Sequence, residues 1–120
     1  THNHRLTMES FISLIESAIA SIKRLIKRFI KGVLSFFENV VAWFKKLRLV
    51  KGRDIPFLMT PSKMKEYLDV APVHNCGVFN AVYNEETDSI THHEFIGADK
   101  LDSETKSVLS KATEGIVVFQ

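Results

Sequence analysis

One series of apolar residues constrains this chain more than any other feature. From Met8 to Leu47, an apolar side chain recurs at alternating spacings of four and three residues. An α-helix turns once in 3.6 residues, so this spacing places the whole series on one side of a helix. The sequence therefore predicts a single amphipathic helix over residues 8–49, about 60 Å long at a rise of 1.5 Å per residue.

Such a helix is too long for a chain of 120 residues to cover with its own remaining residues. Its apolar side is therefore expected to pack against other copies of the chain or against a helical protein partner. Isoleucine at both repeat positions in the first half favours three or more helices over a pair. The seam residues that would make this contact are Ile12, Ile15, Ile19, Ile22, Ile26, Phe29, Val33, Phe36, Val40 and Trp43.

The rest of the chain predicts a small acidic domain at residues 61–120, joined to the helix by a linker at 50–60. Its strand and helix signals follow one another as β-β-α-β, so the fold class is α+β. Turn residues at 84–88 separate the two strands of a hairpin. The expected elements are a helix starting at Thr60-Pro61, strands at 76–83 and 89–96, a helix capped by Asp102, and a strand at 116–119.

Charge is divided sharply along the chain. Residues 8–53 contain ten Lys or Arg and three Glu, whereas residues 54–120 contain five Lys and eleven Asp or Glu. Opposite charges of this kind can complement each other, within one chain or between copies. Alternatively, the basic half can bind an outside anion such as a lipid headgroup.

A cluster of cations on the predicted helix is the most distinctive functional signal. It has the pattern of an amphipathic helix that binds anionic lipid at a membrane surface, and the same pattern fits a calmodulin-type target helix. The structural alternative is a core helix with a basic, solvated outer face. Nucleic acid is disfavoured, because the aromatic residues lie on the apolar side and not among the cations. The cations are Lys23, Arg24, Lys27, Arg28 and Lys31.

Cysteine and histidine residues provide a second candidate site. His74, Cys76 and His92 would approach one another if the two hairpin strands pair, but a zinc site needs four ligands. The run Asn75-Cys76-Gly77-Val78-Phe79 resembles the stretch around the nucleophile of SUMO-protease-like (Ulp-type) cysteine peptidases, which would make Cys76 the nucleophile. In that family the cysteine begins a helix, whereas here the pattern is that of a strand. We therefore assign no catalytic residue and no metal ligand.

These observations predict a non-enzymatic self-assembly or protein-interaction module without a cofactor. The alternatives are a peripheral membrane protein that binds anionic lipid, and a small Cys/His hydrolase or metal-binding protein. Charged residues interrupt every apolar run, which argues against a signal peptide and a transmembrane helix. The expected location is the cytoplasm, with peripheral membrane contact as the alternative. Residues 1–7, which contain two His, are interpreted as the remnant of an expression tag.

Overall fold

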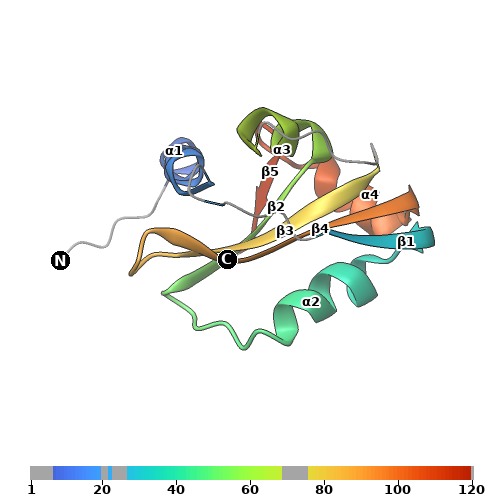
Figure 1. The fold of residues 1–120 in the computed structure, drawn as a ribbon, viewed down its shortest axis with the longest axis horizontal. Helices are drawn as coiled ribbons and strands as arrows, with labels where there is room; N and C mark the ends of the chain where they lie inside the picture. Colours follow the sequence, from blue (N-terminus) through green and yellow to red (C-terminus); the bar gives the residue numbers. More distant parts are fainter. Residues whose placement is uncertain (1–6, 20–21, 23–26, 69–75, 120) are drawn as a thin grey trace.

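The computed structural model describes residues 7–19, 22, 27–68 and 76–119. The described residues form a five-stranded sheet with helices on both faces (Figure 1). In chain order the elements are α1 (Met8–Ile19), β1 (Lys27–Leu34), the π-helix η1 (Phe36–Val41), α2 (Ala42–Lys45), β2 (Asp54–Met59), α3 (Pro61–Leu68), β3 (Gly77–Asn84), β4 (Ser89–Leu101), α4 (Ser103–Ser110) and β5 (Ile116–Val118).

The strand order is β1-β4-β3-β2-β5, with β1 parallel to β4 and the other neighbouring pairs antiparallel. The structure confirms the α+β class and the β3–β4 hairpin, but the simple β-β-α-β arrangement is wrong. The segment 54–59, which we expected in a linker, is a strand between β3 and β5. Its consecutive buried residues suit a position with neighbours on both edges and a helix layer on each face.

The single helix predicted over residues 8–49 is also wrong. Helix α1 ends at Ile19, and residues 27–34 form an edge strand of the sheet. The apolar pattern misled here because two residues four apart share a face in a strand as well as in a helix. In β1, Ile30 and Leu34 turn towards the core, whereas the seam residues Phe29 and Val33 are 47% and 52% exposed.

Gly32 marks the place where β1 departs from both regular patterns. Its φ of +116° is one that residues with a side chain rarely adopt and that no α-helix contains. The pairing with β4 shifts register between Ile30 and Val33, and the Gly32 N–H donates to Asp99 Oδ2 at 2.9 Å. The irregularity and the exposed Lys27 and Lys31 also make β1 a poor template for edge-to-edge aggregation.

Two apolar cores lie on opposite faces of the sheet. Helices α1 and α3 cover one face, and η1, α2 and α4 contribute to the other (Figure 1). The first core takes Ile12, Ile15 and Ile19 from α1 together with side chains of β2, β3 and β4. The seam of α1 is therefore covered by the protein's own sheet. Figure 1 shows α1 lying across that face, which explains why a short helix can be so apolar.

The helical segment that follows β1 is fixed by side-chain hydrogen bonds. Ser35 Oγ caps η1 by accepting from the Glu38 N–H at 3.2 Å, and Asp102 Oδ2 accepts from the Phe36 N–H at 3.0 Å. From the sheet, the buried Asn80 amide donates to the Asn39 carbonyl at 3.2 Å. These contacts hold η1 and α2 in place over β2 and β3, where they form one wall of a groove.

Candidate binding groove

An apolar groove lies between the η1–α2 segment and the β2–β5 end of the sheet. It consists of two adjoining hollows of about 350 and 630 Å³ that share Pro56 and Phe119. The smaller hollow is lined almost entirely by apolar side chains, and the larger one has charged residues at its margin. We call both together the Phe119 groove; its other lining residues are Phe36, Val40, Val41, Phe44, Lys45, Leu49, Val50, Lys51, Gly52, Asp54, Ile55 and Glu85.

Phe119 is placed at the centre of this groove by backbone and ring contacts. Its N–H donates to the Pro56 carbonyl at 2.9 Å, which extends the β2–β5 pairing by one residue. Its ring centroid lies 6.4 Å from that of Phe36 and 5.9 Å from that of Phe44. Aromatic pairs at these separations add stability beyond their buried area, so the three packed rings form an aromatic floor of the groove.

The margins of the groove expose further apolar area. Phe37 is 62% exposed and packs edge to face on Phe36, with ring centroids 5.6 Å apart. On the larger hollow, Val50 is 47% exposed. Single exposed apolar residues are common, but Val50 lines the larger hollow, and Phe37 packs on Phe36, which lines the smaller one. This grouping is typical of the apolar centre of a binding surface and differs from apolar residues scattered singly over a protein surface.

One side of the groove is strongly basic. The segment 39–53 contains five Lys or Arg and neither Asp nor Glu. Lys45, Lys46, Arg48 and Lys51 are all exposed, and none of them forms an ion pair with a described residue. Only Arg53 is neutralised, by Asp54. The groove therefore carries unpaired positive charge at the end of α2 and along the loop that follows it, residues 45–51, whereas η1 carries the exposed Glu38.

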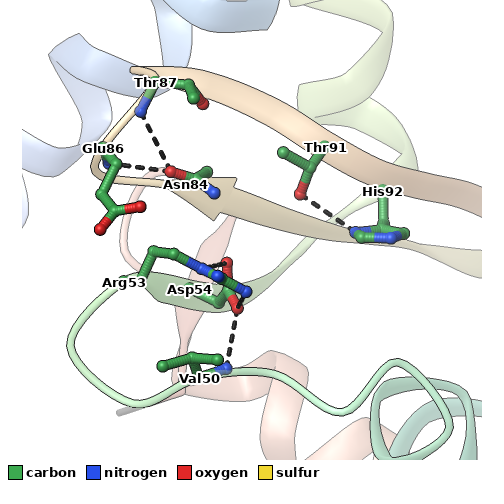
Figure 2. Close-up of polar contacts among 8 residues, drawn as sticks. All are labelled: Val50, Arg53, Asp54, Asn84, Glu86, Thr87, Thr91 and His92. Atoms are coloured by element: carbon green, nitrogen blue, oxygen red, sulfur yellow. Dashed lines mark hydrogen bonds and ion pairs between the residues drawn. The ribbon is translucent and has the colours of Figure 1, made fainter.

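Asp54 closes the turn at the end of the groove (Figure 2). Arg53 Nη2 and Nε donate to its two carboxylate oxygens at 2.8 and 3.1 Å, and the Val50 N–H donates to Oδ2 at 2.8 Å. The hydrogen bonds from Arg53, opposed by burial and supported by the Val50 N–H, lower the pKa of Asp54 below its ordinary value. The carboxylate is thus held ionised and fully engaged in the turn.

The same turn is attached to the β3–β4 hairpin. The Glu85 N–H donates to the Arg53 carbonyl at 2.8 Å. In the hairpin, Asn84 Oδ1 accepts from the N–H groups of Glu86 and Thr87 at 2.8 and 3.0 Å (Figure 2). The predicted turn chemistry of residues 84–88 is therefore confirmed, and the hairpin supports the outer end of the groove.

The lowered pKa of Asp54 predicts how its contribution depends on pH. The folded state binds this proton more weakly than the unfolded state, so the stabilisation is fully present above the ordinary pKa of 3.8. It is lost as the pH falls through the lower folded-state pKa. We expect Asp54→Asn to reduce the free energy of unfolding in urea at pH 7, and the gap to wild type to close as the pH falls below the ordinary pKa of 3.8. A gap that does not change as the pH is lowered would contradict the assignment; Glu16→Gln, at an exposed carboxylate on α1, is the comparison.

The predicted lipid-binding cations do not form one helical face. Lys27 and Lys31 are exposed on one side of β1, whereas Arg28 turns to the other side and pairs with Glu94 at 3.6 Å. Lys23 and Arg24 lie outside the described residues. The expectation of a continuous cationic helix is therefore wrong for residues 27–31, because these residues alternate between the two faces of a strand.

The seam residues are also separated. Ile12, Ile15 and Ile19 are buried in the first core, and Val40 is buried in the second. Trp43 is 7% exposed and Ile22 packs at the edge of the first core. Phe36 lines the groove, and Ile26 lies outside the described residues. Most of these side chains are thus used inside the protein and are not available to a partner in this fold.

The cysteine and histidine residues are not gathered into a site within the described residues. Cys76 is half-buried, and its carbonyl accepts from the Ala98 N–H at 3.1 Å. His92 and His93 occupy opposite faces of β4. The His92 ring contacts the Thr91 hydroxyl (Figure 2). The His93 ring stacks on Phe79, and burial lowers the pKa of His93. His74 lies outside the described residues. In the part of the chain that the structure describes, no three His, Cys, Asp or Glu residues are placed to hold a metal ion.

Sequence reasoning identified part of the groove and missed the rest. Phe36 and Val40 belong to the seam, whereas no pattern in the sequence indicates that Pro56 and Phe119 are their neighbours. The only feature of the sequence that relates to this part of the groove is the aromatic residue Phe119 at the end of the last strand. Its meaning depends on the antiparallel pairing of β5 with β2, which brings Phe119 beside Pro56.

Comparison with known proteins adds no assignment: no family model, curated protein or solved structure matches this chain. Among the described helices, none is long and apolar enough to cross a membrane.

Proposed function

We propose that this chain is a non-enzymatic protein-interaction module that binds a segment of a partner protein in the Phe119 groove. The observation that carries the proposal is the continuous apolar hollow with an aromatic floor and exposed apolar margins. Aromatic residues are enriched in protein interfaces, and a preformed hollow gives a partner's side chains somewhere to be buried. The sheet and its hydrogen-bonded turns hold this surface in shape before a partner arrives.

The polar groups at the groove support binding more than catalysis. Asp54 is the most buried carboxylate there, and its oxygens are occupied by Arg53 and the Val50 N–H. Lys45, Lys51 and Glu85 lie at the exposed margin. A catalytic group needs a free, positioned atom facing the reacting centre, and these side chains do not converge in that way.

The part of β2 that extends beyond β5, residues 54–56, argues for a helical partner and against an added strand in the groove. Strand addition requires free backbone N–H and C=O groups. At this edge Pro56 has no N–H, its carbonyl accepts from Phe119, and the Asp54 N–H donates to the Val50 carbonyl at 2.9 Å. The partner must therefore bind through side chains. The wall formed by residues 36–45 is roughly 15 Å long at helical rise, which suits a helix of two to three turns.

The test is to map the binding surface by NMR. A 15N-labelled chain is titrated with a 14-residue amphipathic peptide that carries Leu on one helical face and Gln on the other. We expect amide shift changes to cluster at residues 36–56 and 119. Val41→Asp should abolish them, because it places a charge in the smaller hollow. Ser13→Asp, on the exposed side of α1 across the sheet, is the matched control and should bind as wild type.

Two outcomes would contradict the proposal. Shift changes confined to the α1–α3 face would move the binding site elsewhere, and no change at millimolar peptide would remove the groove as a binding surface. Light scattering distinguishes a second copy of the chain from another partner. We expect a monomer at micromolar concentration, because the α1 seam is buried internally; a dimer that is lost in Val41→Asp would make a second copy the occupant.

A further inference from the structure

We infer that the partner segment is an acidic amphipathic helix, with apolar side chains in the Phe119 groove and carboxylates facing the cations of its basic side. This inference rests on the proposed function and adds the chemistry of the partner. It starts from the four exposed cations Lys45, Lys46, Arg48 and Lys51, which lie within seven residues of one another and make no ion pair with a described residue.

Unpaired cations crowded in this way repel one another, and a partner carboxylate relieves that repulsion. Lys45 and Lys51 line the smaller and the larger hollow respectively, so the charge follows the groove along its length. The nearby acids do not compensate it: Asp54 is paired with Arg53, Glu85 lies on the hairpin side, and Glu38 on η1 forms no ion pair with these cations. A helix with apolar residues at positions i, i+4 and i+7 and acids on the flank facing α2 complements both features.

The shape of the surface favours a peptide over a lipid bilayer. A bilayer is nearly flat on the scale of this protein, so insertion requires apolar side chains that protrude together. Here most of the apolar area recedes between Phe44 and Pro56, and Phe119 forms its floor. Single-stranded nucleic acid is also disfavoured, because the rings of Phe36, Phe44 and Phe119 pack on each other and do not present a row of free faces for stacking.

The experiment measures fluorescence anisotropy with three labelled 14-residue peptides. All carry the same Leu face, and the flanking positions are Glu, Gln or Lys, which have similar helix propensities. We expect the Glu peptide to bind about tenfold more tightly than the Gln peptide, and the Lys peptide to bind most weakly. The preference should shrink between about 50 and 500 mM salt, because the interacting charges are exposed.

A pair of charge reversals provides the matched test. The double variant Lys45→Glu/Lys51→Glu should bind the Lys peptide better than the Glu peptide. A circular dichroism spectrum that matches wild type shows that the variant is folded. The control is Lys106→Glu/Lys111→Glu, on the exposed side and at the end of α4, which makes the same change in net charge and should keep the wild-type order.

The outcomes separate this inference from the proposed function. Equal affinity for the Glu and Gln peptides, with loss of both in Val41→Asp, overturns the acidic partner and leaves the groove as a protein-binding site. Binding of none of the three peptides overturns both. If the protein binds none of the peptides but floats with vesicles containing about 30% phosphatidylserine, its ligand is a membrane surface and not a peptide. This anionic lipid content gives roughly the surface potential of a cytoplasmic leaflet.

Discussion

Replacement of Ile15 with alanine is expected to lower the free energy of unfolding by about 3 kcal/mol. The Ile15 side chain is fully buried beneath α1, among the side chains of the first core. Truncation removes apolar contacts and leaves a cavity that the packed sheet below cannot fill. This is the expected result for an internal residue, and it differs from that for a residue on an interface between copies.

Urea denaturation followed by circular dichroism measures this effect, and Ser13→Ala is the control. Ser13 lies on the same helix but is exposed, so the control is expected to stay within about 0.5 kcal/mol of wild type. If Ile15→Ala instead left unfolding unchanged but altered the solution mass, the side chain would belong to an interface between copies. The two readouts therefore decide whether α1 packs inward or outward.

The second large effect is expected for Gly77→Ala. A Cβ at Gly77 would lie 2.3 Å from the Ile96 carbonyl oxygen and 3.0 Å from the Gly97 Cα. Gly77 and Gly97 face each other in the β3–β4 pairing, so both obstacles are backbone atoms that cannot move without disturbing the sheet. We expect a loss of about 3 kcal/mol or more in the free energy of unfolding, from overpacking together with backbone strain.

Gly52→Ala is the matched control for Gly77. Gly52 has a φ of +89°, and a Cβ there would meet nothing within 4 Å. The control therefore reports the cost of the backbone conformation without the clash, about 1 kcal/mol. Thermal and urea denaturation measure the free energy of unfolding of both variants. We expect it to fall further in Gly77→Ala than in Gly52→Ala, because only Gly77→Ala adds the steric clash. Equal destabilisation would show that β3 and β4 are farther apart at this point than the structure indicates.

Local signals in the sequence predicted the C-terminal half of the fold well. Thr60 Oγ1 accepts from the Lys63 N–H, Asp102 Oδ1 accepts from the Thr105 N–H, and α3 and α4 begin where these caps place them. The turn predicted at residues 84–88 is confirmed, and the strand predicted at 116–119 forms over Ile116–Val118. Caps and turns depend on interactions between residues a few positions apart, so the sequence contains most of the information that they require.

The candidate site was much less predictable, because its parts come from distant segments. Phe44, Pro56 and Phe119 meet only through the pairing of β5 with β2 and the docking of α2 beside them. The cluster of basic residues can be recognised in the sequence, but the sequence alone does not show that Lys45 and Lys51 border a hollow. A contact between residues more than 60 positions apart leaves no local pattern to read.

What the sequence determined by itself is therefore the α+β class, the hairpin, the helix caps and the apolar character of residues 8–47. The tertiary structure decided what that apolar series becomes. Its four-residue spacings suit a strand as well as a helix, and parallel pairing of β1 with β4 gives residues 27–34 backbone partners as a strand. The sheet also covers α1, so most of the described members of the series are buried within the protein, Phe29 and Val33 are exposed on β1, and no long helix remains to be covered.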